Sequence, residues 1–304
     1  MLSEQVLGLV PDAAEIREVK RLTGGASRET WSFDALIGGA WRPLVLRCGR
    51  AGRGPMTLEA VALEAAARVG VPEPEIVARD DAFLIMERVE GETIARRILR
   101  DERFAAVRPR LAEQCGEILA RIHSIPPDAI PDLGARDPLA ETAAMIHAFE
   151  DPSPALELGL AWLERNRPEP QGEVVLHGDF RLGNLIVGED GVRAVLDWEL
   201  VHQGDPSQDL GYLCVRAWRF GGEHPVGGFG SYEDLFRGYE RVSGRAVDRE
   251  RVRWWEVFGT VWWGGACMLQ AGRHLSGSER SVELAAIGRR VWEQEYDVLL
   301  ALAP

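Results

Sequence analysis

Three short apolar runs in one segment of the chain constrain its fold more than any other feature. Val174–Leu176 is short enough to predict a buried strand. Leu185–Val187 and Val192–Leu196 flank a Glu-Asp-Gly turn, where glycine accepts a positive φ without steric cost. The last two runs therefore predict a hairpin, whose two ends must lie close together. We expect Asn184, just before the first strand, to neighbour Asp197, just after the second.

This pair of side chains has a clear chemical use. One amide oxygen and one carboxylate are suitable ligands for Mg²⁺, which completes its shell with water and substrate phosphates. Asp179 lies five residues before Asn184 and can accept the proton of an attacking hydroxyl. A catalytic Asp, four residues, a metal-binding Asn and a later metal-binding Asp are the spacing of protein kinases. The pattern favours phosphoryl transfer over an isolated structural role for each residue.

The ordered set resembles the aminoglycoside phosphotransferase-like kinases, which include choline kinase-type enzymes, within the protein-kinase-like superfamily. Their signature is His-Gly-Asp, four residues, Asn, a hydrophobic strand, Asp-Trp-Glu, and Gly-Asp-Pro followed by Asp-Leu. Any one triplet is weak evidence, but the whole ordered set is specific. The matching residues are His177-Gly178-Asp179, Asn184, Asp197-Trp198-Glu199, Gly204-Asp205-Pro206 and Asp209-Leu210.

The resemblance implies an α+β, two-lobed protein-kinase-like fold. Its small N-terminal lobe has an antiparallel sheet plus a helix, and its larger C-terminal lobe is mainly helical. We place the nucleotide-binding lobe at residues 1–90 and the catalytic and substrate-binding lobe at residues 91–304. The sequence contains no internal repeat.

The expected catalytic residues are Asp179 and Arg181. The Arg181 guanidinium can hold the transferring phosphoryl group, although a surface ion pair is an equally good interpretation. By resemblance, His177 orders the loop through hydrogen bonds and is not the base. Asp205 and Asp209 are interpreted as structural residues that tie the loop to the next helix.

The expected nucleotide contacts begin at a glycine turn. Gly25 and Ser27 belong to a Gly-Gly-Ala-Ser turn whose backbone N–H groups can approach phosphates; an ordinary hairpin is the alternative. Arg47, at the end of a predicted strand from residue 43, occupies the place of the phosphate-binding lysine of kinases. By resemblance Glu59, on a predicted helix over residues 57–69, pairs with Arg47, and Glu64 is the competing candidate.

A predicted strand over residues 82–86 leads into the expected hinge between the lobes. The resemblance implies that its backbone receives the adenine, which places Glu87 and Val89 among the cofactor-binding residues. The implied cofactors are Mg²⁺ and ATP, with GTP as an alternative phosphoryl donor.

In the second lobe, apolar residues of the 111–122 stretch recur at helical spacing. His123 follows as a satisfied helix-end residue, and two prolines prevent continuation. Helices are also expected near residues 139–149 and 156–164, and on a tryptophan-rich stretch from residue 254. We interpret those tryptophans as core residues, with an acceptor site as the alternative.

The net charge of −13 over 304 residues argues against a nucleic-acid partner, because phosphate backbones need basic surfaces. The richest apolar stretch is interrupted by glycine and too short to span a bilayer, and no signal peptide is recognised. We expect a cytoplasmic protein with no membrane partner and a small-molecule hydroxyl acceptor as its ligand. The sequence specifies no oligomeric state. The cysteines are far apart and expected to be reduced and mostly buried: Cys48, Cys115, Cys214 and Cys267.

The sequence thus predicts an ATP-dependent phosphotransferase that moves the γ-phosphate to a hydroxyl of a small molecule. A catalytically silent nucleotide-binding homologue is the alternative. A metal-dependent or serine hydrolase is disfavoured, because H-E-x-x-H and G-x-S-x-G are both absent. The acceptor stays open between aminoglycoside-like and hydroxyacyl-CoA-like compounds. The second class is considered because the residues around Asp179 and the Asp-Trp-Glu motif resemble the branch of the family that is linked to acyl-CoA dehydrogenases.

Overall fold

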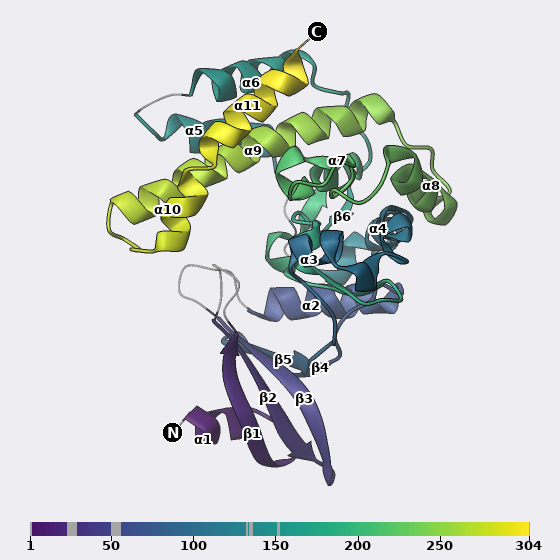
Figure 1. Ribbon diagram of the computed structural model, residues 1–304, viewed down its shortest axis with the longest axis vertical. Helices are drawn as coiled ribbons and strands as arrows, with labels where there is room; N and C mark the ends of the chain where they lie inside the picture. Colours follow the sequence, from purple (N-terminus) through teal and green to yellow (C-terminus); the bar gives the residue numbers. More distant parts are fainter. Residues whose placement is uncertain are drawn as a thin grey trace.

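The structure is a computed structural model that describes residues 2–22, 29–49, 56–131, 133, 136–150 and 153–303. Within these ranges the first part of the chain forms an antiparallel sheet and the remainder is mainly helical (Figure 1). This is the α+β, two-lobed arrangement that the motifs predicted. We call the two parts the small lobe and the large lobe.

The small lobe is built on a five-stranded antiparallel sheet in the order β1-β2-β3-β5-β4. Alternating residues of β2 and β3 bury Phe33, Ala35, Leu44 and Leu46 in one core, as expected for strands with one covered face. Its elements are α1 (Leu2–Leu7), β1 (Ala13–Leu22), β2 (Glu29–Ile37), β3 (Ala40–Cys48), α2 (Met56–Arg68), β4 (Ile76–Arg79) and β5 (Phe83–Glu87).

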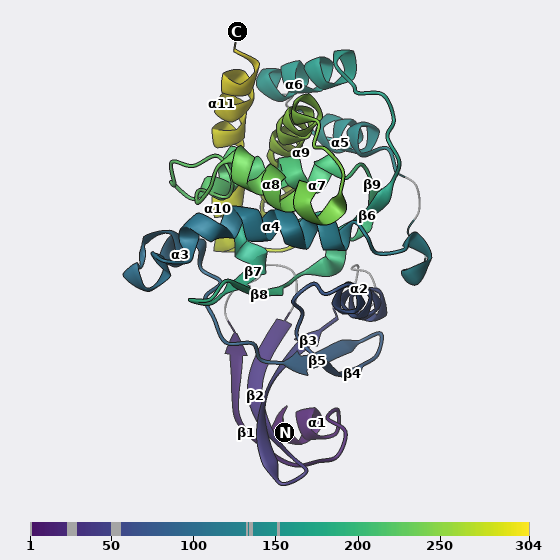
Figure 2. The ribbon, with the colours of Figure 1, turned by 90° about the vertical axis from the view of Figure 1, so that its right-hand side faces the viewer.

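Helix α2 lies between the sheet and the large lobe in both views (Figures 1 and 2). Its alanine-rich face and Leu63 are buried in the same core as Trp198 of the large lobe. Helix formers spaced along one face explain why this segment is helical and why it packs on both sides. Because α2 is held from two directions, a side chain in its first turn has a fixed position between the lobes.

The described residues of the large lobe contain two main cores and a smaller cluster around Tyr212 and Trp218. One main core surrounds α4 and α8, and the other joins α5, α6, α9 and α11. Its helices are α3 (Ala95–Arg100), α4 (Arg108–Ile122), α5 (Pro138–His147), α6 (Pro154–Arg165), α7 (Ser207–Cys214), α8 (Tyr232–Ser243), α9 (Arg249–Leu275), α10 (Val282–Gly288) and α11 (Val291–Leu302). The 3-10 helices are η1 (Glu102–Phe104), η2 (Pro127–Ala129), η3 (Leu182–Asn184), η4 (Trp198–Leu200) and η5 (Arg216–Arg219).

Two small antiparallel sheets carry the motif segment. Strand β6 (Val174–Leu176) pairs with β9 (His202–Gly204), and β7 (Leu185–Val187) pairs with β8 (Val192–Val195). Glu92, in the segment between β5 and α3, forms a β-bridge with Val187. The lobe boundary that we predicted after residue 90 falls in this segment and stays a prediction.

The predicted helices of the large lobe are confirmed with shifts of a few residues at their ends. On α9, Trp254 and Trp255 are buried in a core, and the indole N–H of Trp254 donates to the Leu163 carbonyl at 3.0 Å. The interpretation of these two tryptophans as core residues is therefore confirmed. Among the described residues, no helix combines the length and apolar character needed to cross a bilayer.

Candidate active site

The predicted hairpin is confirmed and brings its two ends together. Leu185 pairs with Val195, and the Leu196 N–H donates to the Asn184 carbonyl at 2.8 Å. Asp197 follows directly, so the two expected metal ligands come from adjacent backbone segments. Asp197 has φ 69° and ψ 63°, in the left-handed region, which aspartate tolerates better than most residues because its short side chain hydrogen-bonds locally.

Both carboxylate oxygens of Asp179 accept hydrogen bonds. Arg181 Nε donates to Oδ1 at 2.9 Å, and Asn184 Nδ2 donates to Oδ2 at 2.6 Å. Asn184 Nδ2 also donates to the Asp179 carbonyl at 2.9 Å. Burial, and after it the nearby Asp179 carboxylate, raises the pKa of Tyr212 well above its ordinary value, so its phenol stays protonated. The loop therefore presents one carboxylate in a fixed orientation.

Arg181 is more than a surface ion pair. Its side chain is 25% exposed, and its guanidinium lies over the Trp218 ring at 4.8 Å from the centroid. Such a cation–π contact is worth roughly 0.5–2 kcal/mol, more where water is excluded. Sequence patterns did not indicate Trp218, because nothing local links η5 to the loop of residues 177–184, which we call the catalytic loop.

His177 is a fully buried ring that holds the loop. Its Nδ1 accepts from the Asp179 N–H at 3.2 Å, so Nε2 carries the proton and donates to the Leu196 carbonyl at 3.1 Å. The ring contacts Trp198 at a centroid distance of 4.8 Å. Burial lowers the pKa of His177 below its ordinary value of 6.5, so the ring stays neutral. The expected ordering role fits these contacts.

Asp209, at 0% exposure, ties the same loop to α7. Its oxygens accept from the N–H groups of His177 and Gly178 at 2.8 and 2.9 Å, and His123 Nε2 lies at 3.3 Å. Burial is the largest single influence and acts to raise the pKa of Asp209. The hydrogen bonds and the nearby histidines together outweigh it, so the pKa lies below its ordinary value. The structural interpretation of Asp209 is supported, but no sequence pattern indicated that His123 hydrogen-bonds to it.

Asp205 and Tyr239 complete this framework from neighbouring elements. Asp205 accepts from the Ser207 N–H at 2.8 Å at the start of α7, and it pairs with Arg251 of α9. Tyr239 of α8 hydrogen-bonds His123 Nδ1 at 2.9 Å. His123 is thus the satisfied helix-end residue that we expected.

One arginine of the small lobe reaches the end of the hairpin. Arg47 on β3 forms an ion pair with Glu59 of α2, and its Nη2 donates to Asp197 Oδ1 at 2.9 Å. Glu59 is 1% exposed and Arg47 12% exposed. The expected pairing of these two residues is confirmed, whereas the competing Glu64 pairs with Arg79 at 3.1 Å. The contact with Asp197 was not foreseen.

The residues at the hairpin ends suit Mg²⁺. The side-chain nitrogen of Asn184 is used by Asp179, and no hydrogen bond from the described residues engages its side-chain oxygen Oδ1. Asp197 uses one oxygen for Arg47 and keeps the second. Mg²⁺ is commonly held by one or two such protein oxygens plus substrate phosphates and water. Within the described part of the chain no cluster of three or more His, Cys, Asp or Glu side chains forms a metal site.

The remaining expected nucleotide contacts lie in the small lobe. Glu87 at the end of β5 pairs with Arg42, and its N–H donates to the Glu75 carbonyl at 2.8 Å. Among the described residues the Val89 amide makes no hydrogen bond, which leaves it available. Gly25 and Ser27 lie outside the described residues.

This combination of a two-lobed fold and a kinase-type loop defines a class of phosphotransferases. A sequence model described as the phosphotransferase enzyme family matches residues 18–255, well over half of the 304 residues. The chain belongs to this family.

Curated relatives fall into two groups. Acyl-CoA dehydrogenase family member 10 of Mus musculus is 32% identical over 174 residues, which are 50% of this chain and 16% of that protein. An aminoglycoside 3′-phosphotransferase of Streptomyces fradiae is 29% identical over 216 residues, 66% of this chain and 76% of that protein. The chain thus matches a fifth or less of the length of acyl-CoA dehydrogenase family members 10 and 11.

Solved structures share the fold at low identity. A choline/ethanolamine kinase family protein of Mesorhizobium loti has a TM-score of 0.71 at 17% identity, covering 100% of this chain and 96% of that one. An aminoglycoside phosphotransferase bound to ADP and hygromycin B has a TM-score of 0.67 at 16% identity, covering 100% and 99%. These structures show the fold, and the sequence model confirms the family assignment made from the motifs.

Proposed function

We propose that this phosphotransferase is an ATP-dependent kinase that transfers the γ-phosphate to a hydroxyl of a small molecule. The observation that carries the proposal is the meeting of Arg47, from the small lobe, with Asp197, beside the loop that holds Asp179. A phosphate-binding cation, a metal-binding carboxylate and a base are thereby gathered where the lobes meet. The ADP-bound relative supports a nucleotide as donor, and GTP is the alternative to ATP.

In the proposed reaction Asp179 orients the acceptor hydroxyl and accepts its proton as the oxygen attacks the γ-phosphorus. The bond from the γ-phosphorus to the β–γ bridging oxygen breaks, and ADP leaves. Arg181, fixed against Trp218, stabilises charge on the transferred group. Positioning and electrostatic stabilisation supply most of the rate in such reactions.

Asn184 and Asp197 are the proposed magnesium ligands. When bound there, Mg²⁺ would neutralise charge on the β- and γ-phosphate oxygens. Arg47, held by Glu59, would position the same phosphates. The Glu87 and Val89 backbone would receive the base, and Gly25 and Ser27 would cover the phosphates.

The acceptor has two candidate classes at this point. The Streptomyces fradiae relative is named for aminoglycosides, and the partial matches are named for acyl-CoA dehydrogenases. The first supports an aminoglycoside-like acceptor and the second a hydroxyacyl-CoA-like one. A fold shared at such identities does not fix the substrate.

The deciding experiment is an ATP-consumption screen over aminoglycosides, hydroxyacyl thioesters and other hydroxylated metabolites. With an accepted substrate, Asp179→Asn should lower turnover by about 10²–10⁴-fold without weakening Mg–ATP binding measured by calorimetry. Asp190→Asn is the matched control, because Asp190 lies in the turn of the same hairpin with its side chain 71% exposed. Full turnover by Asp179→Asn would remove the base assignment.

One observation favours a second candidate, a nucleotide-binding protein without catalysis. Arg181 and Asn184 each donate to one oxygen of Asp179, so two of its lone-pair sites are already engaged before an acceptor hydroxyl arrives. Tight Mg–ATP binding with slow ATP loss that no acceptor accelerates would support this alternative. Acceptor-dependent ADP formation would exclude it.

A further inference from the structure

A groove of about 910 Å³ runs across the large lobe between α3, η5 and the start of α11. It concentrates positive charge in an acidic chain, which has 48 acidic against 35 basic side chains. Its two carboxylates belong to Glu293 and Asp297. Its four basic residues are Arg96, Arg100, Arg216 and Arg290. Four cations against two anions leave a surplus of two positive charges.

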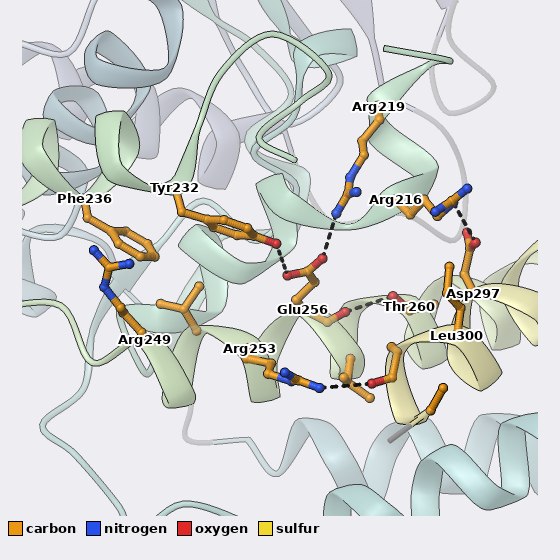
Figure 3. A pocket seen from close by; sticks show the side chains of 14 residues that line it. Arg216, Arg219, Tyr232, Phe236, Arg249, Arg253, Glu256, Thr260, Asp297 and Leu300 are labelled. Atoms are coloured by element: carbon orange, nitrogen blue, oxygen red, sulfur yellow. Dashed lines mark hydrogen bonds and ion pairs between the residues drawn. The ribbon is translucent and has the colours of Figure 1, made fainter. Parts of the chain in front are cut away.

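Two of the arginines are neutralised by the groove itself. Arg216 pairs with Asp297 at 3.1 Å and Arg290 with Glu293 at 2.9 Å. Figure 3 shows the Arg216–Asp297 pair, which also borders a separate cavity of about 390 Å³ behind it. In that cavity Arg219 is neutralised in turn by Glu256, at 3.0 Å.

Arg96 and Arg100 carry the surplus charge. They are exposed and lie one turn apart on α3, so their side chains share one helix face. Within the described part of the chain neither forms an ion pair or a side-chain hydrogen bond; the neighbouring Arg97 and Arg103 are the ones that hold Glu92. Two guanidinium groups held side by side are suited to bind phosphate or carboxylate oxygens through several donors.

Aromatic side chains line the opposite side of the groove. Trp292 is 80% exposed and Tyr296 60% exposed, and they lie one turn apart on α11. Large aromatic residues are highly buried on average, and exposed ones grouped in a groove mark binding sites. Beside arginines they offer faces on which a planar ring can stack.

The groove adjoins the catalytic loop through shared tryptophans. Ala217 lines the groove, and the next residue, Trp218, holds Arg181. Trp218 contacts Trp263 at a centroid distance of 4.8 Å, and Arg290 lies over Trp263 at 5.9 Å. In Figures 1 and 2, α3 lies on the part of the large lobe that faces the small lobe. The groove is therefore linked to the loop that holds Asp179 through η5 and the Trp218–Trp263 pair.

We propose that the groove binds the anionic, ring-bearing end of the acceptor, so that the kinase acts on a hydroxyl compound with phosphate groups and a planar ring. The inference rests on the proposed function and selects between its two acceptor classes. The surplus positive charge disfavours a polycation such as an aminoglycoside, although the whole chain has a net charge of −13. Local charge decides recognition here, because net charge governs mainly solubility and long-range association.

The test is calorimetry on the full chain, first with Mg–AMP-PNP to fill the nucleotide site and then with probes. Adenosine 3′,5′-bisphosphate supplies phosphates and a ring, pyrophosphate supplies phosphates alone, and kanamycin is the polycation. The bisphosphate should bind and kanamycin should not. Arg96→Glu combined with Arg100→Glu should weaken the bisphosphate and pyrophosphate by about tenfold or more. Trp292→Ala should weaken the bisphosphate by about fivefold or more and leave pyrophosphate unchanged.

The matched control carries the same change in charge elsewhere. Arg165→Glu combined with Arg245→Glu alters two exposed arginines outside the groove and should leave both affinities unchanged. The inference would be overturned if Mg–AMP-PNP bound but the bisphosphate did not. It would also be overturned if the groove variant and this control bound the bisphosphate equally well. Failure of Mg–AMP-PNP to bind in the first titration would instead count against the proposed function, and the comparison of the two double variants would still decide whether the groove binds anions.

Discussion

The catalytic loop and the arginine groove are built in opposite ways. In the loop, His177, Asp179 and Asp209 are buried or partly buried and have protein partners at hydrogen-bond distance. In the groove, Arg96 and Trp292 are exposed, and no side-chain hydrogen bond holds them within the described residues. The contrast teaches that the chemistry is fixed by internal bonds, whereas the surface that we assign to recognition is free to take its partners from a ligand.

The largest expected effect on stability comes from removing the Asp209 carboxylate, which accepts hydrogen bonds from the loop. Asp209→Ala leaves two backbone N–H groups and His123 without their shared acceptor, so we expect a loss of about 3 kcal/mol or more in the free energy of unfolding. Urea denaturation followed by tryptophan fluorescence measures it. Trp292→Ala is the comparison in the groove and should change stability by less than about 0.5 kcal/mol. Equal losses for the two variants would remove the distinction between the regions.

A smaller effect is expected at Gly178. Its φ is +82°, and a Cβ there would lie 2.4 Å from the Leu200 carbonyl oxygen. Gly178→Ala should therefore cost about 2–3 kcal/mol, the left-handed conformation accounting for about 1–2 kcal/mol of it.

Gly39 offers the matched control, because its φ is +83° and nothing lies within 4 Å of its Cβ position. Gly39→Ala pays the conformational cost alone. If thermal denaturation showed the same loss of stability for the two alanine variants, the close approach of Leu200 would contribute nothing to the cost of Gly178→Ala.

The smallest effect concerns pH. Burial holds the pKa of His177 below 6.5, so the unfolded chain takes up this proton at a higher pH than the folded chain. The stabilising contribution is complete above pH 6.5 and is lost as pH falls toward the folded pKa, at no more than about 1.4 kcal/mol per pH unit. Urea midpoints between pH 7.5 and 5 should therefore fall less steeply in His177→Gln than in the unaltered protein. Parallel slopes would contradict a neutral buried ring.

Sequence patterns were sufficient for the parts of the site that lie on one local element. The hairpin followed from two apolar runs around a turn, whereas the Arg47–Glu59 pair, which joins two elements, followed only from the resemblance. Sequence patterns could not predict the partners of Asp209 or the contact of Arg181 with Trp218, because these residues meet only through packing of α4, α7 and η5. The groove was also missed, since exposure of Arg96 or Trp292 depends on what the rest of the fold leaves uncovered.

The ion pairs of Arg47 make nucleotide arrival a substitution and not a simple addition. One guanidinium already serves carboxylates from both lobes, Glu59 and Asp197. In the proposed reaction, triphosphate oxygens that approach Arg47 would compete with Asp197 for this guanidinium, and an oxygen released by Asp197 would be available to the cation that accompanies the phosphates. The measured affinity is therefore the difference between two ionic arrangements, and added salt, which weakens both, should change it less than the charge of the triphosphate alone would imply.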